Sequence, residues 1–182
     1  LLLTREGLTT GDNDRFLRRW FEVSHSRIAP PSLFASEPDS FAKHRWYMYV
    51  KGGEFRRWYG NFEFVVDWEF NGRRVMSNVD AKTGRVRSHN YNGEYAYQEG
   101  LTWSGMSSSK FSARYVPVGH MFDAKGPMGF AAERIDLLAA LAVLNSRSTD
   151  RYLGMLAPNL DFKLGHVLNL PAPASKGSRK EL

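Results

Sequence analysis

The strongest constraint on the fold is a change of hydrophobic spacing late in the chain. In residues 133–145, ERIDLLAALAVLN, apolar side chains recur at helical spacing, and the acids come early, where a helix N-terminus favours them. Residues 146–157 predict a second short helix, with Ser148 or Thr149 as its N-cap and Pro158 as its stop. We expect this helical pair to cover the β-sheet of the same domain.

That sheet is predicted from the segments before residue 120, where strands and long loops alternate. RWYMYV (45–50) and FEFVVDWEF (62–70) are strand candidates. One face of the second would carry Phe62, Phe64, Val66, Trp68 and Phe70. Asn71–Gly72 predicts a hairpin turn, with Arg73 and Arg74 leading the return strand.

Shorter segments complete the pattern. Residues 7–13 are a turn cluster, 16–23 a short helix or strand, 80–86 a turn and 160–171 a short strand or extended segment. Strands first and helices late predict an α+β fold: a mixed or antiparallel twisted β-sheet with long loops and a C-terminal helical pair.

Length and composition allow one domain, which we place at residues 1–171, followed by a disordered tail at 172–182. No apolar run reaches the roughly 18 residues of a transmembrane helix, and the opening LLLTREG is too short for a signal peptide. No methionine precedes it, so we expect the chain to begin inside a longer polypeptide. Cysteine is absent, which excludes disulfides and thiolate metal sites and fits a cytoplasmic protein.

Positive charge is concentrated in one part of the chain. The net charge is +6 and the isoelectric point near 9.6, and residues 43–87 hold ten cations against five acids. A clustered basic excess is expected for a DNA or RNA partner, and a solvated basic surface is the alternative.

The segment KGGEFRRWYGN (51–61) lies inside this basic region and combines flexible backbone, cations and planar rings. Its glycines let main-chain amides approach a phosphate, and Arg56 and Arg57 can clamp phosphates or contact guanine edges. Trp58 or Tyr59 would stack on a base. In the alternative, Phe55 and Trp58 plug the core while the arginines are solvated.

Residues 98–130 form a second unusual segment, rich in glycine, serine and aromatic residues, in which Lys110 and Arg114 are the contact candidates. Motifs for self-contained chemistry are missing. The chain has no GxGxxG turn, Walker loop or GxSxG elbow, and its five histidines lack metal-ligand spacing. A hydrolase would need a Ser/His/Asp or acidic metal cluster assembled in space.

Four segments in one order carry a resemblance to a known family. They are GLTTGDNDRFLRRWFEV, KGGEFRRWYGNFEFVVDWE, EGLTWSGMSSSKFSARYVPVGHMFDAKG and LLAALAVLNSRSTDRYLGMLAPNLDFKLGHVLNLP. Together they resemble the target-recognition region of the PglX-type adenine-specific DNA methyltransferases of BREX phage-resistance systems. More broadly, they are similar to specificity domains of TaqI-like and Type IIG restriction-modification enzymes.

This resemblance implies a recognition lobe that reads double-stranded DNA opposite a catalytic lobe. The family's Asn-Pro-Pro-Tyr motif and its S-adenosylmethionine loop are not in this chain, so no catalytic residue or cofactor site transfers, and S-adenosylmethionine belongs to the presumed parent enzyme. The helices at 133–157 would pack on the sheet or on the catalytic lobe. Charge and resemblance together predict seven DNA-binding residues: Lys51, Arg56, Arg57, Arg73, Arg74, Lys110 and Arg114. The alternative is a protein-interaction module that docks on other defence proteins, with an incidental basic patch.

Overall fold

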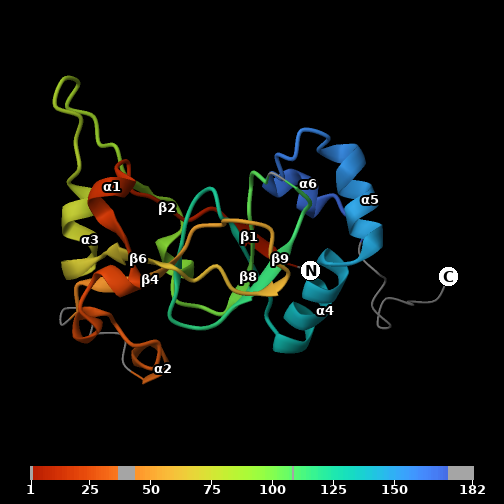
Figure 1. Ribbon diagram of the computed structural model, residues 1–182, viewed down its shortest axis with the longest axis horizontal. Coiled ribbons are helices and arrows are strands. Elements are labelled where there is room, and N and C mark those ends of the chain that lie inside the picture. The colour runs from red at the N-terminus through yellow and green to blue at the C-terminus, as the bar shows by residue number, and fades with distance from the viewer. Residues whose placement is uncertain (1, 37–43, 108, 172–182) are drawn as a thin grey trace.

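The computed structural model describes residues 2–36, 44–107 and 109–171, and the predicted tail lies outside them. The described part is elongated, with helices α4 to α6 gathered at one end and α1 to α3 at the other (Figure 1). Strands fill the middle in sheets of five, four and two strands. The predicted α+β class with mixed sheets is confirmed.

The five-stranded sheet carries the helical end. Its order is β1 (Leu3–Arg5), β11 (Met128–Phe130), β8 (Gly100–Trp103), β9 (Ala113–Val116) and β5 (Trp58–Tyr59). Neighbours are antiparallel except β5 and β9, which run parallel. Every residue of β8 is buried, as expected for a central strand covered on both faces.

The four-stranded sheet lies toward the other end. Its order is β10 (Met121–Phe122), β4 (Trp46–Val50), β6 (Phe64–Asp67) and β3 (Leu17–Arg19). The two-stranded sheet pairs β2 (Leu8–Thr9) with β7 (His89–Asn90). The strand predicted at 45–50 is therefore confirmed, within one residue, as β4.

The C-terminal helices form largely where the periodicity predicts them. Helix α4 (Arg134–Leu144) packs Leu137, Leu141 and Leu144 on β8 and β9, and α5 (Arg147–Leu156) follows. Ser146, rather than Ser148 or Thr149, is the N-cap of α5, because its Oγ accepts a hydrogen bond from the Thr149 amide at 3.2 Å. The prediction of a short strand or extended segment at 160–171 is wrong, since α6 (Leu164–Leu168) forms there.

The turn from α4 into α5 is tied to the sheet by one side chain. Asn145, buried at the C-cap of α4, accepts from the Ala113 amide at 3.1 Å and donates to the Ala113 carbonyl at 2.9 Å. Its Nδ2 also donates to the Leu141 carbonyl. The Asn145 side chain thus pairs with β9 as a neighbouring strand would. It satisfies backbone groups of Ala113 and Leu141 that burial would otherwise leave unpaired.

The hairpin predicted at Asn71–Gly72 is wrong. Strand β6 ends at Asp67, and Phe70, Asn71 and Gly72 adopt left-handed backbone with φ of 50°, 56° and 72° at the start of α3 (Glu69–Met76). Gly72 packs so closely on the Trp68 indole that a Cβ would lie 2.5 Å from it, which requires glycine. The turn leaves Phe70 62% exposed, so Phe70 is not on the predicted buried face.

Short elements complete the end opposite the C-terminal helices. Residues predicted as helix or strand at 16–23 contain both kinds of element, because α1 (Asn13–Phe16) leads directly into β3. The other short elements are η1 (Trp20–Glu22), η2 (His25–Arg27), α2 (Leu33–Ser36) and η4 (Gly93–Tyr95). In the described ranges, no helix combines the length and the apolar character needed to cross a membrane.

Candidate nucleic-acid interface

The loop at residues 51–61 lies between β4 and β6 and includes the two-residue strand β5. Gly52 and Gly53 have φ of +73° and +119°. The Ser104 hydroxyl donates to the Gly53 carbonyl at 2.8 Å, and Asn61 Nδ2 donates to the Glu54 carbonyl at 3.0 Å. The first bond ties the loop to the residue after β8 and the second joins two residues of the loop, so it presents its side chains from a defined backbone.

Aromatic side chains project from this loop. Phe55, Trp58 and Tyr59 are all exposed, Trp58 by 53%. Trp58 also has a φ of +75°, a conformation that is rare and costly for a bulky side chain. The alternative in which Phe55 and Trp58 plug the core is therefore wrong. A strained backbone that holds a tryptophan in solvent is more typical of a functional loop than of a loop whose side chains fill the core.

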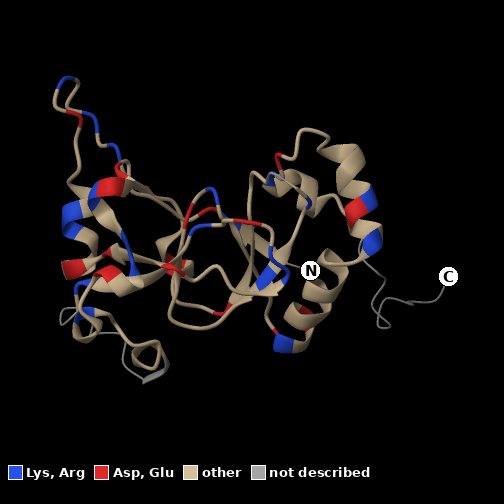
Figure 2. Ribbon diagram, viewed as in Figure 1, with Lys and Arg blue, Asp and Glu red and all other residues tan. Residues whose placement is uncertain are grey.

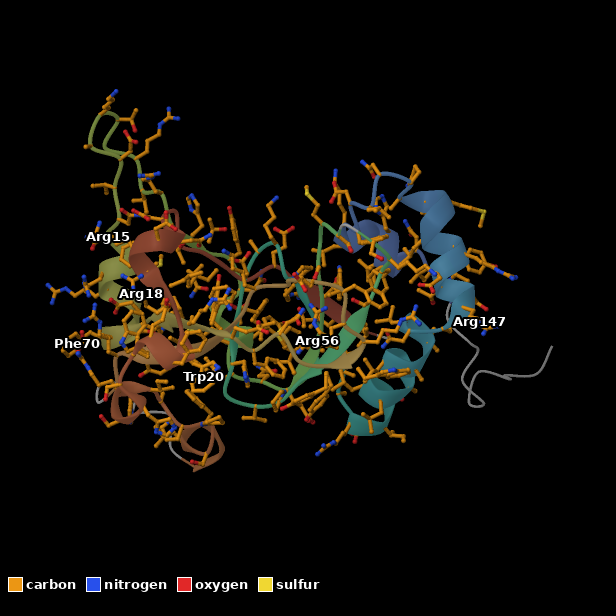
Figure 3. All side chains as sticks on the ribbon, viewed as in Figure 1. Arg15, Arg18, Trp20, Arg56, Phe70 and Arg147 are labelled. Atoms are coloured by element: carbon orange, nitrogen blue, oxygen red, sulfur yellow. The ribbon has the colours of Figure 1, made fainter. Side chains whose placement is uncertain are left out.

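The two arginines of the loop have different environments (Figure 3 labels Arg56). Arg56 is exposed, and its aliphatic chain crosses Gly60, where a Cβ would lie 2.5 Å from Arg56 Cδ. Arg57 is half-buried, and its Nη2 donates to Asp150 Oδ2 at 2.7 Å. Arg56 is thus available to a ligand, whereas Arg57 ties the loop to α5.

Arg114 lies beneath the loop and is fully buried. Its guanidinium donates to the Arg56 carbonyl and to the hydroxyls of Ser104 and Ser112, all at 3.4–3.5 Å, near the limit for a hydrogen bond. Among the described residues it forms no ion pair. Burial, together with the nearby charge of Arg56, lowers the pKa of Arg114 to about 10. Arg114 cannot reach a ligand in this conformation, but its weakly compensated charge makes the surface above it attractive to anions.

The remaining predicted cations do not converge on the loop. Lys110 is exposed in the β8–β9 connection, close in sequence to Ser112, whose hydroxyl accepts from the Arg56 amide. Arg73 and Arg74 lie on α3, at the opposite end from the C-terminal helices. Arg74 Nη1 donates to Asp67 Oδ2 at 2.6 Å, and Arg45 donates to the same oxygen. Arg74 is therefore paired with a buried carboxylate although its own side chain is 47% exposed, whereas Arg73 is exposed and lies next to it in the sequence.

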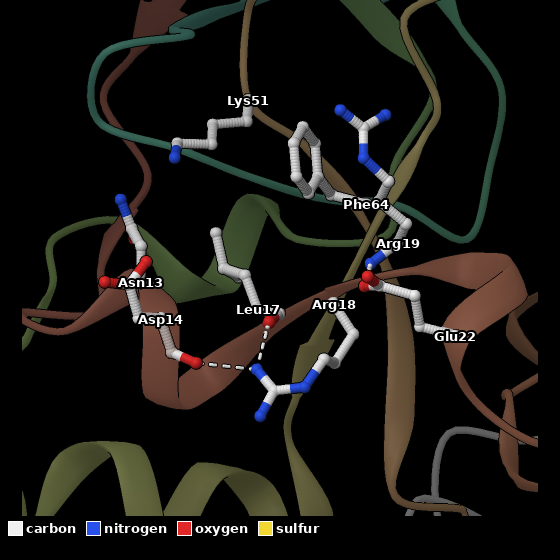
Figure 4. Close-up of a pocket in the computed structure, with 8 residues that line it drawn as sticks. All are labelled: Asn13, Asp14, Leu17, Arg18, Arg19, Glu22, Lys51 and Phe64. Atoms are coloured by element: carbon white, nitrogen blue, oxygen red, sulfur yellow. Dashed lines mark hydrogen bonds between the residues drawn. The ribbon is translucent and has the colours of Figure 1, made fainter.

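A basic pocket begins at the other end of the loop, at Lys51 (Figure 4). The pocket is open, has a volume of about 370 Å³, and brings Lys51 together with Arg18 and Arg19 of β3. The Phe64 ring lies between two of these cations, with Lys51 Nζ and Arg19 Cζ each 5.5 Å from its centroid. Such stacking keeps flexible basic side chains extended over the pocket.

Arg18 and Arg19 are functional candidates that the sequence-based prediction missed. The run DRFLRR beside the TTGDN turn was their sequence signal. Two acids, Asp14 and Glu22, also line this pocket, and Glu22 Oε2 accepts from the Arg19 amide at 2.6 Å. Arg18 Nη1 donates to the carbonyls of Asp14 and Leu17, which leaves the rest of its guanidinium open to a ligand.

Cations are spread along most of the molecule rather than gathered on one compact spot (Figure 2). Within the described ranges, no group of three metal-ligating side chains comes together. Exposed cations are thus available at several separated points of the described surface.

Two known methyltransferases contain a segment similar in sequence to this chain. No family model matches the chain. The chain is 48% identical over 172 residues to the adenine-specific methyltransferase PglX of Lacticaseibacillus casei (strain Zhang), and 32% identical over 167 residues to the adenine-specific methyltransferase BrxX of Escherichia coli O9:H4 (strain HS). These matches cover 94% and 90% of this chain but only 14% and 12% of the two relatives. Over nearly its whole length, the chain is thus similar to one segment of PglX-type adenine-specific methyltransferases, as the four ordered motifs predict.

Proposed function

We propose that the chain is the DNA-recognition lobe of an adenine-specific DNA methyltransferase in a BREX-type phage-defence or restriction-modification system. The observation that carries the proposal is the loop at 51–61, which displays Arg56, Trp58 and Tyr59 above the buried charge of Arg114. Similarity to the two methyltransferases supports the choice of DNA as the ligand.

The loop offers complementary chemistry for duplex DNA. Exposed Arg56 can bind a phosphate or fork onto a guanine, and the exposed rings can stack on bases. The field of Arg114 adds attraction without a direct contact, because burial reduces the screening of its charge. In this proposal Arg57 and Arg114 are positioning residues, whereas Arg56, Lys110 and Arg73 contact DNA.

The pocket at Lys51 supplies a second group of contacts. Lys51 follows β4 whereas Arg18 and Arg19 belong to β3, yet the three side chains line one open surface. Cations at several separated points suit phosphates along a duplex better than a single small anion.

The methyl-transfer chemistry is assigned to the rest of the parent enzyme. S-adenosylmethionine would bind in a lobe outside this chain, because no glycine-rich strand–helix turn occurs in the sequence. The fragment itself therefore needs no catalytic residue under this proposal.

Fluorescence anisotropy of a labelled duplex, recorded over a range of KCl concentrations, tests the proposal. The chain should bind with an affinity that falls steeply as salt rises. Arg56→Ala should weaken binding by ~1–3 kcal/mol if it reads a base, or lower the salt slope by about 1 if it contacts a phosphate. Arg147→Ala, which removes an exposed cation at the start of α5, is the control and should leave binding unchanged. Absence of salt-dependent binding by the unsubstituted chain would refute the proposal.

A second candidate function is docking on another protein domain, and one observation favours it. Helix α4 exposes Ile135, Leu138 and Ala142 along one side, with Ile135 72% exposed. These positions follow an i, i+3, i+7 pattern, so they form a continuous apolar stripe. We propose the methyltransferase lobe as its partner. Calorimetric titration of the chain with the separately produced methyltransferase lobe of the Lacticaseibacillus casei relative should show binding that Ile135→Glu abolishes.

A further inference from the structure

A short β-hairpin at residues 79–87 projects from the end of the molecule that carries α3. It is the yellow-green extension at the upper left of Figure 1. Val79 and Val86 form an antiparallel bridge, and the Asp80 amide donates to the Arg85 carbonyl at 2.8 Å. Both valines are about half exposed. The segment was predicted only as a turn, and neither the proposed loop nor the pocket includes it.

The base of the hairpin is anchored in the core. Asn78 and Ser88, the residues on either side of it, are buried. The Ser88 hydroxyl donates to the Val75 carbonyl at 2.6 Å, and Asn78 Nδ2 donates to the Thr10 carbonyl at 3.3 Å. The Arg87 amide donates to the Asn78 carbonyl at 2.8 Å, next to the isolated Val79–Val86 bridge, and closes the base of the hairpin. The projection therefore starts from a fixed platform.

The tip is preorganised as well. Asp80 Oδ1 accepts from the Lys82 amide at 3.0 Å, the Thr83 amide at 2.9 Å and the Thr83 hydroxyl at 3.1 Å. These hydrogen bonds lower the pKa of Asp80 and keep the carboxylate ionised in the turn. Gly84 closes the turn with a φ of +67°, which a side chain would disfavour.

The exposed charges of this hairpin are mostly positive. Lys82, Arg85 and Arg87 are exposed, and Asp80 is the single acid among residues 79–87, with one oxygen occupied by the turn. Figure 2 shows blue segments at the tip and along the arm. A structural turn needs no such concentration of cations, and their mutual repulsion is relieved by a polyanion.

We propose that this hairpin is a second DNA-contacting element, which enters the major groove as a two-stranded ribbon. The proposal rests on the DNA-recognition function proposed above. The major groove, about 12 Å wide, admits a two-stranded β-ribbon. In this position Lys82, Arg85 and Arg87 meet phosphates on the walls of the groove, while the exposed valines face the base edges.

Anisotropy titrations at several KCl concentrations test the phosphate contacts. The chain with Lys82→Ala, Arg85→Ala and Arg87→Ala should lose affinity, and its salt slope should fall by about 2–3, because up to three phosphate contacts are removed. A matched control replaces Arg147 and Arg151 of α5 and Lys163, the N-cap of α6, by alanine, which removes the same charge from the opposite end of the molecule. A second variant, Arg85→Lys with Arg87→Lys, keeps the charge and should keep the slope.

Chemical protection identifies the groove. Dimethyl sulfate modifies guanine N7 in the major groove and adenine N3 in the minor groove. The unsubstituted chain should protect N7 positions that the alanine variant leaves reactive. Protection at adenine N3 instead would overturn the assignment to the major groove.

The outcomes separate this proposal from the one it rests on. If the unsubstituted chain binds DNA and the triple-alanine variant matches it in affinity and slope, the hairpin proposal fails while the recognition function stands. If the unsubstituted chain shows no salt-dependent binding, both fail. Thermal unfolding of each variant checks folding, and we expect little change because the three side chains are exposed and the Asp80 turn is retained.

Discussion

Arg57 Nη2 lies 2.7 Å from Asp150 Oδ2, and this ion pair connects the loop at 51–61 to the first turn of helix α5. Both side chains are partly buried, at 29% and 21% exposed, and the Arg57 guanidinium also lies over the Phe55 ring. The position of the aromatic loop is thereby coupled to the C-terminal helices, although the two segments are far apart in sequence.

Replacing Asp150 with asparagine should release this connection. Asp150→Asn leaves the Arg57 guanidinium without its charged partner, so we expect a loss of about 1 kcal/mol in the free energy of unfolding. The loop should also become more mobile, and acrylamide quenching of tryptophan fluorescence should increase. Urea denaturation and quenching measure the two effects.

The control for this variant is Asp136→Asn. Asp136 occupies the first turn of α4 as Asp150 does that of α5, but it is exposed and forms no ion pair with a described residue. It therefore reports the loss of a helix-dipole interaction alone. Equal destabilisation by the two substitutions would show that the Arg57 contact contributes nothing.

The buried hydrogen bonds of Asn145 to β9 should contribute strongly to the free energy of unfolding. Asn145→Ala removes the paired hydrogen bonds to Ala113 and leaves a buried amide and carbonyl of β9 unsatisfied, at a cost of roughly 2–4 kcal/mol. Asn169→Ala removes the C-cap asparagine of α6, which is exposed, and should cost far less. Chemical denaturation compares the two, and similar midpoints would contradict the role assigned to Asn145.

The elements that sequence patterns predict well here are those whose local signals and packing agree. Helix α4 has apolar side chains at helical spacing, and its inward leucines do cover the sheet. Strand β4 is apolar and β-branched or aromatic along most of its length, as a mostly buried strand requires. Helical spacing predicts the end of α4 within one residue, but the pairing of Asn145 with a distant strand is a tertiary contact that local spacing does not encode.

Failures occur where long-range contacts override local signals. Asn71–Gly72 resembles a hairpin turn, yet the close approach of Gly72 to Trp68 favours a left-handed turn into α3. Arginine is usually a surface residue, and the sequence therefore predicts that Arg114 is exposed. In the structure β9 is covered on both sides, so Arg114 is buried. The basic run that contains Arg18 and Arg19 does not by itself predict a site, because only the fold brings these residues to Lys51.

Protonation of His120 should make stability depend on pH in the mildly acidic range. His120 is buried beside Phe62, and its Nδ1 lies 3.0 Å from the Pro117 carbonyl oxygen. Burial lowers the pKa of His120 below its ordinary value of 6.5. As pH falls below that value, the unfolded chain takes up a proton before the folded chain does, so the free energy of unfolding decreases.

His120→Gln should remove this contribution. Urea denaturation over a pH series should show the stability of the unsubstituted chain falling, relative to the variant, as pH drops through 6.5 toward the lowered pKa. His25→Gln, which replaces an exposed imidazole, is the control. A stability difference between the unsubstituted chain and His120→Gln that is independent of pH would contradict the prediction.

A substitution at Trp58 should weaken DNA binding without lowering the stability of the fold. Its φ of +75° is costly for tryptophan and free of steric cost for glycine, so Trp58→Gly relieves about 1–2 kcal/mol of backbone strain. The exposed indole contributes little packing to offset this relief. We therefore expect an unchanged or raised melting temperature together with DNA affinity weakened by about 1–3 kcal/mol, the value of one stacked base.

Tyr152→Ala, which removes an exposed ring from α5, should change neither quantity appreciably. A destabilised Trp58→Gly variant with full DNA affinity would mean that the tryptophan serves the fold instead of the ligand.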